Sequence, residues 1–89
     1  MKPIVYVLTV FVDDQADSWV SGIYKSIKAA KQAALEITKD REGKNDVTLE
    51  WQEYWVETTW SETKVKRLEG RVLPESWDMY EIMETKVEG

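Results

Sequence analysis

Residues Ile4 to Val12 form an unbroken run near the N-terminus in which every residue is apolar or β-branched. Successive side chains of a strand point to opposite faces of its sheet. A strand can therefore carry such a run where it has neighbours on both sides and both of its faces are largely covered. The run predicts an inner strand of a sheet, and the rest of the chain must supply the strands and the layer that surround it.

The segment after this strand predicts a hairpin followed by one helix. Residues 18–25 alternate in polarity after a polar turn, which is typical of a second strand paired with the first. Ser26 is a candidate N-cap for an alanine-rich helix over residues 26–41, because its hydroxyl can accept a hydrogen bond from a free amide of the first turn. Five residues gather on the side of this helix expected to pack on the sheet: Ile27, Ala30, Ala33, Ala34 and Ile37.

The second half of the chain predicts three more strands, over residues 47–60, 64–73 and 77–87. In the first of them the apolar residues change phase, and a β-bulge near Gln52 and Glu53 would reconcile the two halves. The predicted order is ββαβββ, an α+β fold with a mostly antiparallel sheet of about five strands and one helix packed on a face. A chain of 89 residues forms a single domain, residues 1–89.

Several classes of function are disfavoured by what the sequence lacks. The chain has no histidine and no cysteine, so general-base and thiol chemistry would depend on carboxylates or lysines, and none of these stands in a recognisable catalytic context. Asp13, Asp14 and Asp17 do not have the spacing of a calcium loop and fit a solvated turn better. The four glycines form no phosphate-binding loop. We therefore expect no enzyme, no metal and no cofactor.

The same composition bears on location and assembly. The apolar run at the N-terminus is too short to span a bilayer and lacks the cleavage site of a signal peptide, so a cytoplasmic protein without membrane contact is expected. Without disulfides the fold depends on its core or on self-association, and a homodimer stays open.

Charge divides the chain into two unequal halves. Residues 1–46 hold seven acids and seven bases, whereas residues 47–89 hold ten acids and five bases, so the whole net charge of −5 falls in the second half. Two acidic strands that were neighbours in the sheet would present carboxylates at spacings close to those of DNA phosphates, as a nucleic-acid mimic does, and would repel nucleic acid itself. Alternatively, the acids keep the outer face of the sheet soluble. Bases on the intervening strand would neutralise part of the patch: Lys64, Lys66, Arg67 and Arg71.

Five tryptophans are more than the core of so small a domain needs, and each belongs either to the core or to an interface: Trp19, Trp51, Trp55, Trp60 and Trp77. Trp55 and Trp60 lie beyond the suspected bulge and are expected to be more exposed than Trp19. Together with the acids they define the expected partner-binding residues: Glu50, Glu53, Trp55, Glu57, Trp60, Glu81 and Glu84.

The opening of the chain resembles a group of small uncharacterised phage and bacterial proteins. The shared pattern is Tyr6-Val7-Leu8, a polar turn, then Gly22-Ile23-Tyr24-Lys25-Ser26 and an alanine-rich helix. The resemblance implies a strand-strand-helix start and a gene of a mobile element, and it assigns no catalytic residue. Residues 47–89 have no such match.

These observations favour a non-enzymatic binding protein, encoded by a phage or another mobile element, that blocks a basic, nucleic-acid-binding surface of a host or defence protein. An anti-CRISPR inhibitor is the concrete example, by analogy of size and charge. One alternative is a homo-oligomer that sequesters a nucleotide-like small molecule in tryptophan-lined pockets with Arg67 or Arg71. Another is a housekeeping regulator with no inhibitory role.

Overall fold

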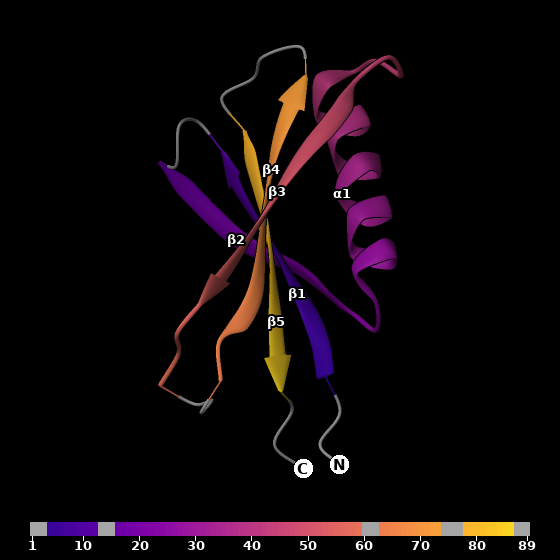
Figure 1. The fold of residues 1–89 in the computed structure, drawn as a ribbon. Coiled ribbons are helices and arrows are strands. Elements are labelled where there is room, and N and C mark those ends of the chain that lie inside the picture. The colour runs from indigo at the N-terminus through magenta and orange to yellow at the C-terminus, as the bar shows by residue number, and fades with distance from the viewer. Residues whose placement is uncertain (1–3, 13–15, 60–62, 74–77, 87–89) are drawn as a thin grey trace.

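A computed structural model describes residues 4–12, 16–59, 63–73 and 78–86, and it has the predicted ββαβββ order (Figure 1). The elements are β1 (Ile4–Val12), β2 (Asp17–Tyr24), α1 (Ile27–Glu42), β3 (Thr48–Val56), β4 (Val65–Leu73) and β5 (Met79–Lys86). The five strands form one antiparallel sheet in the order β2-β1-β5-β4-β3. The predicted α+β fold is confirmed. β3 ends at Val56, whereas the predicted strand extended to Trp60.

The strand order gives β1 neighbours on both sides, as predicted for an inner strand. It pairs with β2 on one side and with β5 on the other, because the last strand inserts between β1 and β4. β2 and β3 are left as the two edges of the sheet. β4 lies between β3 and β5, and this separates the two acidic strands.

The helix begins and ends where its local sequence indicates. The Ser26 hydroxyl accepts a hydrogen bond from the Ala29 amide at 3.1 Å, which satisfies one free amide of the first turn. Gly43 takes the left-handed conformation at φ 68° and donates its amide hydrogen to the Lys39 carbonyl at 2.9 Å. The predicted range of 26–41 therefore matches α1 to within one residue at each end.

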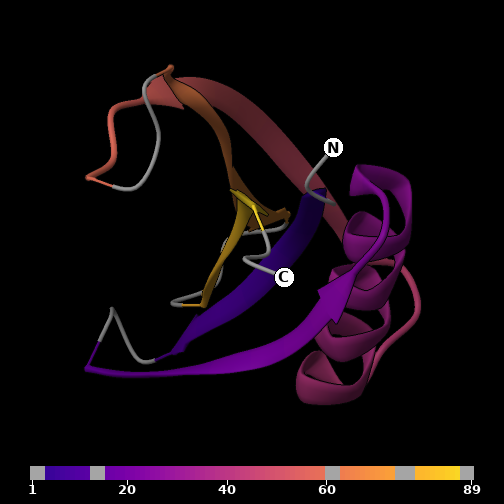
Figure 2. The same ribbon diagram turned by 90° about the horizontal axis from the view of Figure 1, so that it is seen from below.

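One face of the sheet packs against α1, and the core lies between them (Figures 1 and 2). Ala30, Ala34 and Thr38 are fully buried on the helix, and Ala33 is only half-buried. The predicted helix face is correct, but its most buried positions are Ala30 and Ala34, and Ala33 lies at its border. The strands contribute the larger core side chains, all of them fully buried: Leu8, Val10, Leu68, Tyr80 and Ile82.

The opposite face of the sheet is covered by no element that the structure describes. Val5, Val7 and Phe11 of β1 point to this face and are half-buried by their neighbours in the sheet. The described elements therefore place a second layer on only one face of β1, while the side chains on its other face are partly exposed. Among the described elements α1 is the one helix, and it packs on the other face of the sheet (Figure 2).

The predicted bulge near Gln52 and Glu53 is also wrong. β3 pairs with β4 in an unbroken register from Thr48 to Val56. The phase change has another cause: Leu49 and Trp51 face α1, whereas Val56 on the other face lies opposite the buried Val65. The irregularity of the sheet lies between β1 and β2 instead, where the register shifts between Leu8 and Thr9.

This shift changes which residues of β2 face the helix. Trp19 pairs with Val10 and Gly22 pairs with Leu8, so both point to the core face, together with Tyr24. Uninterrupted alternation would have placed Trp19 on the opposite side from Gly22. The ring of Trp19 lies 5.8 Å from the guanidinium of Arg41, near the end of α1.

Candidate functional site

The predicted binding residues divide between the two faces of the sheet. Glu53 pairs with the buried Leu68, and Trp55 pairs with Lys66 two residues further along, so both lie on the face that carries α1. Glu50 lies three residues before Glu53 and faces the opposite side. Residues that alternate along two strands cannot all reach one flat partner surface, so the predicted set does not form one site.

Glu81 on the opposite face is engaged within the protein. Its carboxylate accepts a hydrogen bond from Arg67 Nε at 2.7 Å, and its side chain is only 18% exposed. Arg67 also lies 3.5 Å from Glu69, which in turn lies 3.8 Å from Arg71. Burial acts to lower the pKa of Arg67, but Glu81 and Glu69 outweigh it and the pKa is raised. This network holds Arg67 and Glu81 to each other.

The end of β3 carries Trp55 on the α1 face, and two other predicted residues, Glu57 and Glu84, come after the strand and from β5. Trp55 is 60% exposed, compared with 42% for Trp19, as predicted. Glu57 follows the strand and is exposed, and Glu84 of β5 belongs to the same face because it pairs with Tyr6, two residues from Leu8. We call this region the β3-end surface and define it by five residues: Glu53, Trp55, Glu57, Lys66 and Glu84.

Lys66 is the one base of the β3-end surface and touches two of its members. Its Nζ lies 4.0 Å from Glu53 Oε1 and 5.4 Å from the centre of the Trp55 ring. The expected cross-strand neutralisation is therefore present for Glu53, although Glu53 is more than half exposed and such a pair is weak. Glu57 and Glu84 leave the surface with a net negative charge.

One expected arrangement of the predicted residues is absent from the structure, and one predicted residue lies outside the described part of the chain. The acidic strands β3 and β5 are not neighbours, since the basic strand β4 lies between them, so they do not form the continuous acidic face of a nucleic-acid mimic. Trp60 lies outside the described residues.

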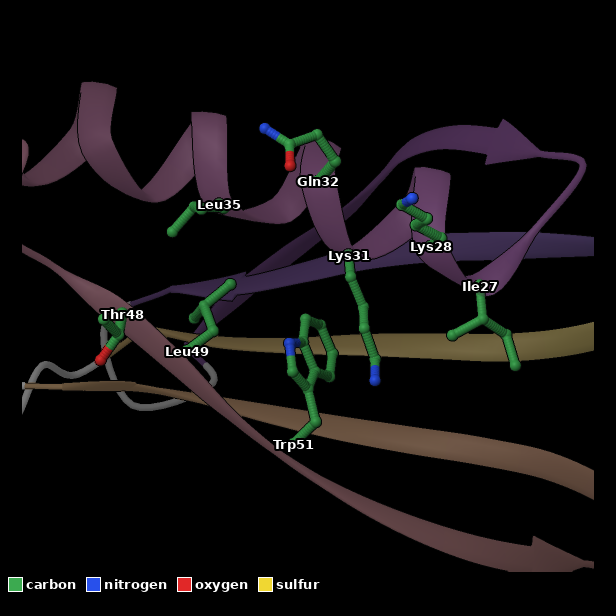
Figure 3. Close-up of a pocket in the computed structure, with 8 residues that line it drawn as sticks. All are labelled: Ile27, Lys28, Lys31, Gln32, Leu35, Thr48, Leu49 and Trp51. Atoms are coloured by element: carbon green, nitrogen blue, oxygen red, sulfur yellow. The ribbon is translucent and has the colours of Figure 1, made fainter.

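A groove between α1 and β3 was missed by the sequence analysis (Figure 3). It has a volume of about 520 Å³ and is lined by eight residues: Ile27, Lys28, Lys31, Gln32, Leu35, Thr48, Leu49 and Trp51. Leu35 was the one signal in the sequence, because it is a large apolar residue on the otherwise polar side of the predicted helix. Its partner strand could not be identified without the fold.

Trp51 forms the floor of this groove and lies against Gly70 of β4. A Cβ atom at Gly70 would come within 2.7 Å of the indole ring, so the ring occupies the space that any larger residue would need. The predicted small-molecule pocket was expected to combine tryptophan with Arg67 or Arg71. Both arginines lie on the opposite face of the sheet from Trp51, and lysines of α1 take their place beside the ring.

Other kinds of site find no support among the described residues. Within them, no group of three or more acidic side chains is arranged to hold a metal ion. The described part of the chain also contains no helix long and apolar enough to cross a membrane.

Comparison of the chain with protein-family models, with curated proteins and with solved structures finds no match. The resemblance to phage and bacterial proteins therefore stays a prediction from the opening residues.

Proposed function

We propose that this chain is a non-enzymatic protein-binding protein that docks its β3-end surface against a basic surface of another protein. The observation that carries the proposal is the exposure of Trp55 at the end of an edge strand, with Glu53 and Glu57 on either side of it in the sequence.

An exposed tryptophan among carboxylates has the composition of an interface hot spot. Indole rings are enriched among residues whose truncation costs binding energy, because they bury a large area with few rotatable bonds. Acids around such an anchor select a basic partner and accelerate the encounter with it. The chain as a whole carries a charge of −5, which favours the same partner at longer range.

The specific form of the proposal is an inhibitor of nucleic-acid recognition. A protein that binds nucleic acid presents a basic surface to the phosphates, and a small acidic domain seated on that surface excludes the substrate. The resemblance of the opening residues, from Tyr6 into the alanine-rich helix, to phage and bacterial proteins supports a host or defence protein as the partner, with a CRISPR effector as one example.

Charge reversal at the β3-end surface tests the proposal. Glu53→Lys with Glu57→Lys should abolish capture of the partner from a bacterial extract, because both new charges would face a basic surface. The fold should persist, since both side chains are exposed. A matched control reverses two exposed acids elsewhere, Asp40→Lys with Asp46→Lys, and should retain capture. If the two double variants bind alike at physiological salt, the β3-end surface is not the interface.

A further inference from the structure

The α1–β3 groove exists because one helix is too narrow for this sheet. A helix is about 10 Å across, whereas five strands at about 4.8 Å spacing present a face roughly twice as wide. α1 makes its main contacts with β1, β2 and β5. The α1 face of β3 is therefore left beside the flank of the helix (Figure 1). The groove runs between them (Figure 3).

The side chains of α1 that line the groove follow helical spacing. Lys28, Lys31 and Leu35 lie at positions i, i+3 and i+7, which places them along one flank of the helix. Leu35 is only partly exposed there. Leu49 and Trp51 provide the apolar floor from β3. The groove thus combines an apolar floor with a lysine rim.

The charge of the groove is opposite to that of the protein. Among its eight lining residues two are lysines and none is a carboxylate, although the chain has a net charge of −5. Glu36 accepts a hydrogen bond from Gln32 at 3.1 Å, but it is exposed and does not line the groove. Within the described part of the chain neither Lys28 nor Lys31 forms a salt bridge with a carboxylate.

Lys31 is held over the aromatic ring. Its Nζ lies 5.8 Å from the centre of the Trp51 ring, and the two side chains run side by side in Figure 3. Lys31 and Trp51 are both partly exposed. A cation–π contact that keeps access to water is weak, so the ammonium can turn to an anionic group without a large loss. Trp51 keeps its position because one side of the ring rests on Gly70.

We infer that the α1–β3 groove binds a small planar organic anion, with the ring of the ligand against Trp51 and Leu35 and its anionic group between Lys28 and Lys31. The volume of about 520 Å³ lies within the range of small-molecule sites. The phosphate of a nucleotide and the carboxylate of an aromatic acid share this chemistry, and titration with one ligand of each kind distinguishes the two sources. The inference is independent of the β3-end surface.

The test follows the indole N–H of Trp51 by NMR, with the signal assigned through Trp51→Phe. Four probes are titrated: adenosine monophosphate, 2-naphthoate, and their neutral counterparts adenosine and 2-naphthamide. At least one anion should shift the Trp51 signal saturably, with an affinity about tenfold above that of its neutral counterpart, the ratio expected for a charge-assisted contact. The anion that does so identifies the source as a nucleotide or an aromatic acid.

Variants of the lysines locate the anionic end. Lys28→Gln and Lys31→Gln should each weaken binding of that anion about tenfold, whereas Lys64→Gln removes an exposed lysine far along the chain and should change little. Circular dichroism checks that each variant folds. The inference fails if neither anion shifts Trp51, if the neutral probes bind equally well, or if the three lysine variants behave alike.

Discussion

Gly70 is the residue on which the position of Trp51 depends. Glycine inside a strand normally costs stability, because it gains flexibility in the unfolded chain and offers no side chain for packing. Here its missing side chain makes room for the indole, which would meet an added Cβ atom at 2.7 Å. Gly22 has the same relation to Tyr24, whose hydroxyl group lies 2.7 Å from the corresponding point. The glycine of the Gly22-Ile23-Tyr24 motif thus accommodates its own aromatic neighbour.

Gly70→Ala should therefore destabilise the protein by about 1–2 kcal/mol, because the added Cβ atom displaces the Trp51 ring from its position against the strand. Urea unfolding of a double-mutant cycle measures the effect. In a Trp51→Ala background the same change should cost nothing or stabilise the protein, since no ring remains to be displaced. An equal cost in both backgrounds would show that Gly70 serves another purpose.

Ionisation of the buried Tyr80 phenol makes the stability of the fold depend on pH in the alkaline range. Burial raises the pKa of its phenol above the ordinary value of about 10, and the nearby Thr38 hydroxyl offsets only part of this effect. The unfolded chain therefore loses the proton at a lower pH than the folded chain. Stability is fully present below about pH 10 and should fall as the pH rises through the folded-state pKa.

Tyr80→Phe tests this titration. The variant lacks the phenol, so its free energy of unfolding should fall less steeply above about pH 10 than that of the parent chain. Tyr54→Phe removes an exposed phenol instead and should keep the steep parental slope. Parallel pH profiles for the parent chain and Tyr80→Phe would exclude the buried phenol as the source.

At the scale of elements, α1 docks through alanines that leave no room for larger side chains. Ala34→Leu should destabilise the fold by about 1–3 kcal/mol through overpacking, because Ala34 is fully buried against the sheet. Ala29→Leu makes the same change at an exposed position of the same helix and should alter stability little. Thermal or urea unfolding of both variants checks the docking, and equal stabilities would place this helix face in solvent.

The type and order of the elements could be predicted because each depends on local patterns. The β-branched run of β1, the serine cap and alanines of α1, and Gly43 at its end act over a few residues each. The bulge predicted in β3 is wrong because the local pattern of apolar residues has two possible causes. Apolar residues change face along β3 because the helix covers only one part of the strand, and a pattern of hydrophobicity does not distinguish that cause from an inserted residue.

The candidate site was predictable only in part, for a related reason. Trp55 is more exposed than Trp19, as predicted, but the bulge from which that prediction was argued is absent from β3. The pairing of Arg67 with Glu81 and the separation of β3 from β5 depend on strand order, which joins residues far apart in the chain. The α1–β3 groove exists because the sheet is wider than one helix, which a local pattern does not reveal. In the sequence, its one sign is Leu35, an apolar residue on the otherwise polar side of the helix.

For the whole molecule, the fold places some of the acids of the second half beside basic side chains. β4 lies between β3 and β5, and its Lys66 and Arg67 give one acid of each neighbouring strand, Glu53 and Glu81, a basic partner. The β3-end surface keeps exposed acids beside the exposed Trp55. Its contact with a basic partner should weaken at high salt, since exposed charges are screened over about 10 Å at 0.1 M ionic strength.

Site-specific photo-cross-linking tests the central claim most directly. A benzophenone amino acid replaces Trp55 in one variant and Tyr54 in another, since these neighbours on β3 are both exposed but face opposite sides of the sheet. In a bacterial extract, position 55 should give a dominant adduct with one basic protein, and position 54 should not. Adding Glu53→Lys with Glu57→Lys should remove the adduct. No adduct at position 55, the same adduct from both positions, or an adduct that survives charge reversal would contradict docking through the β3-end surface.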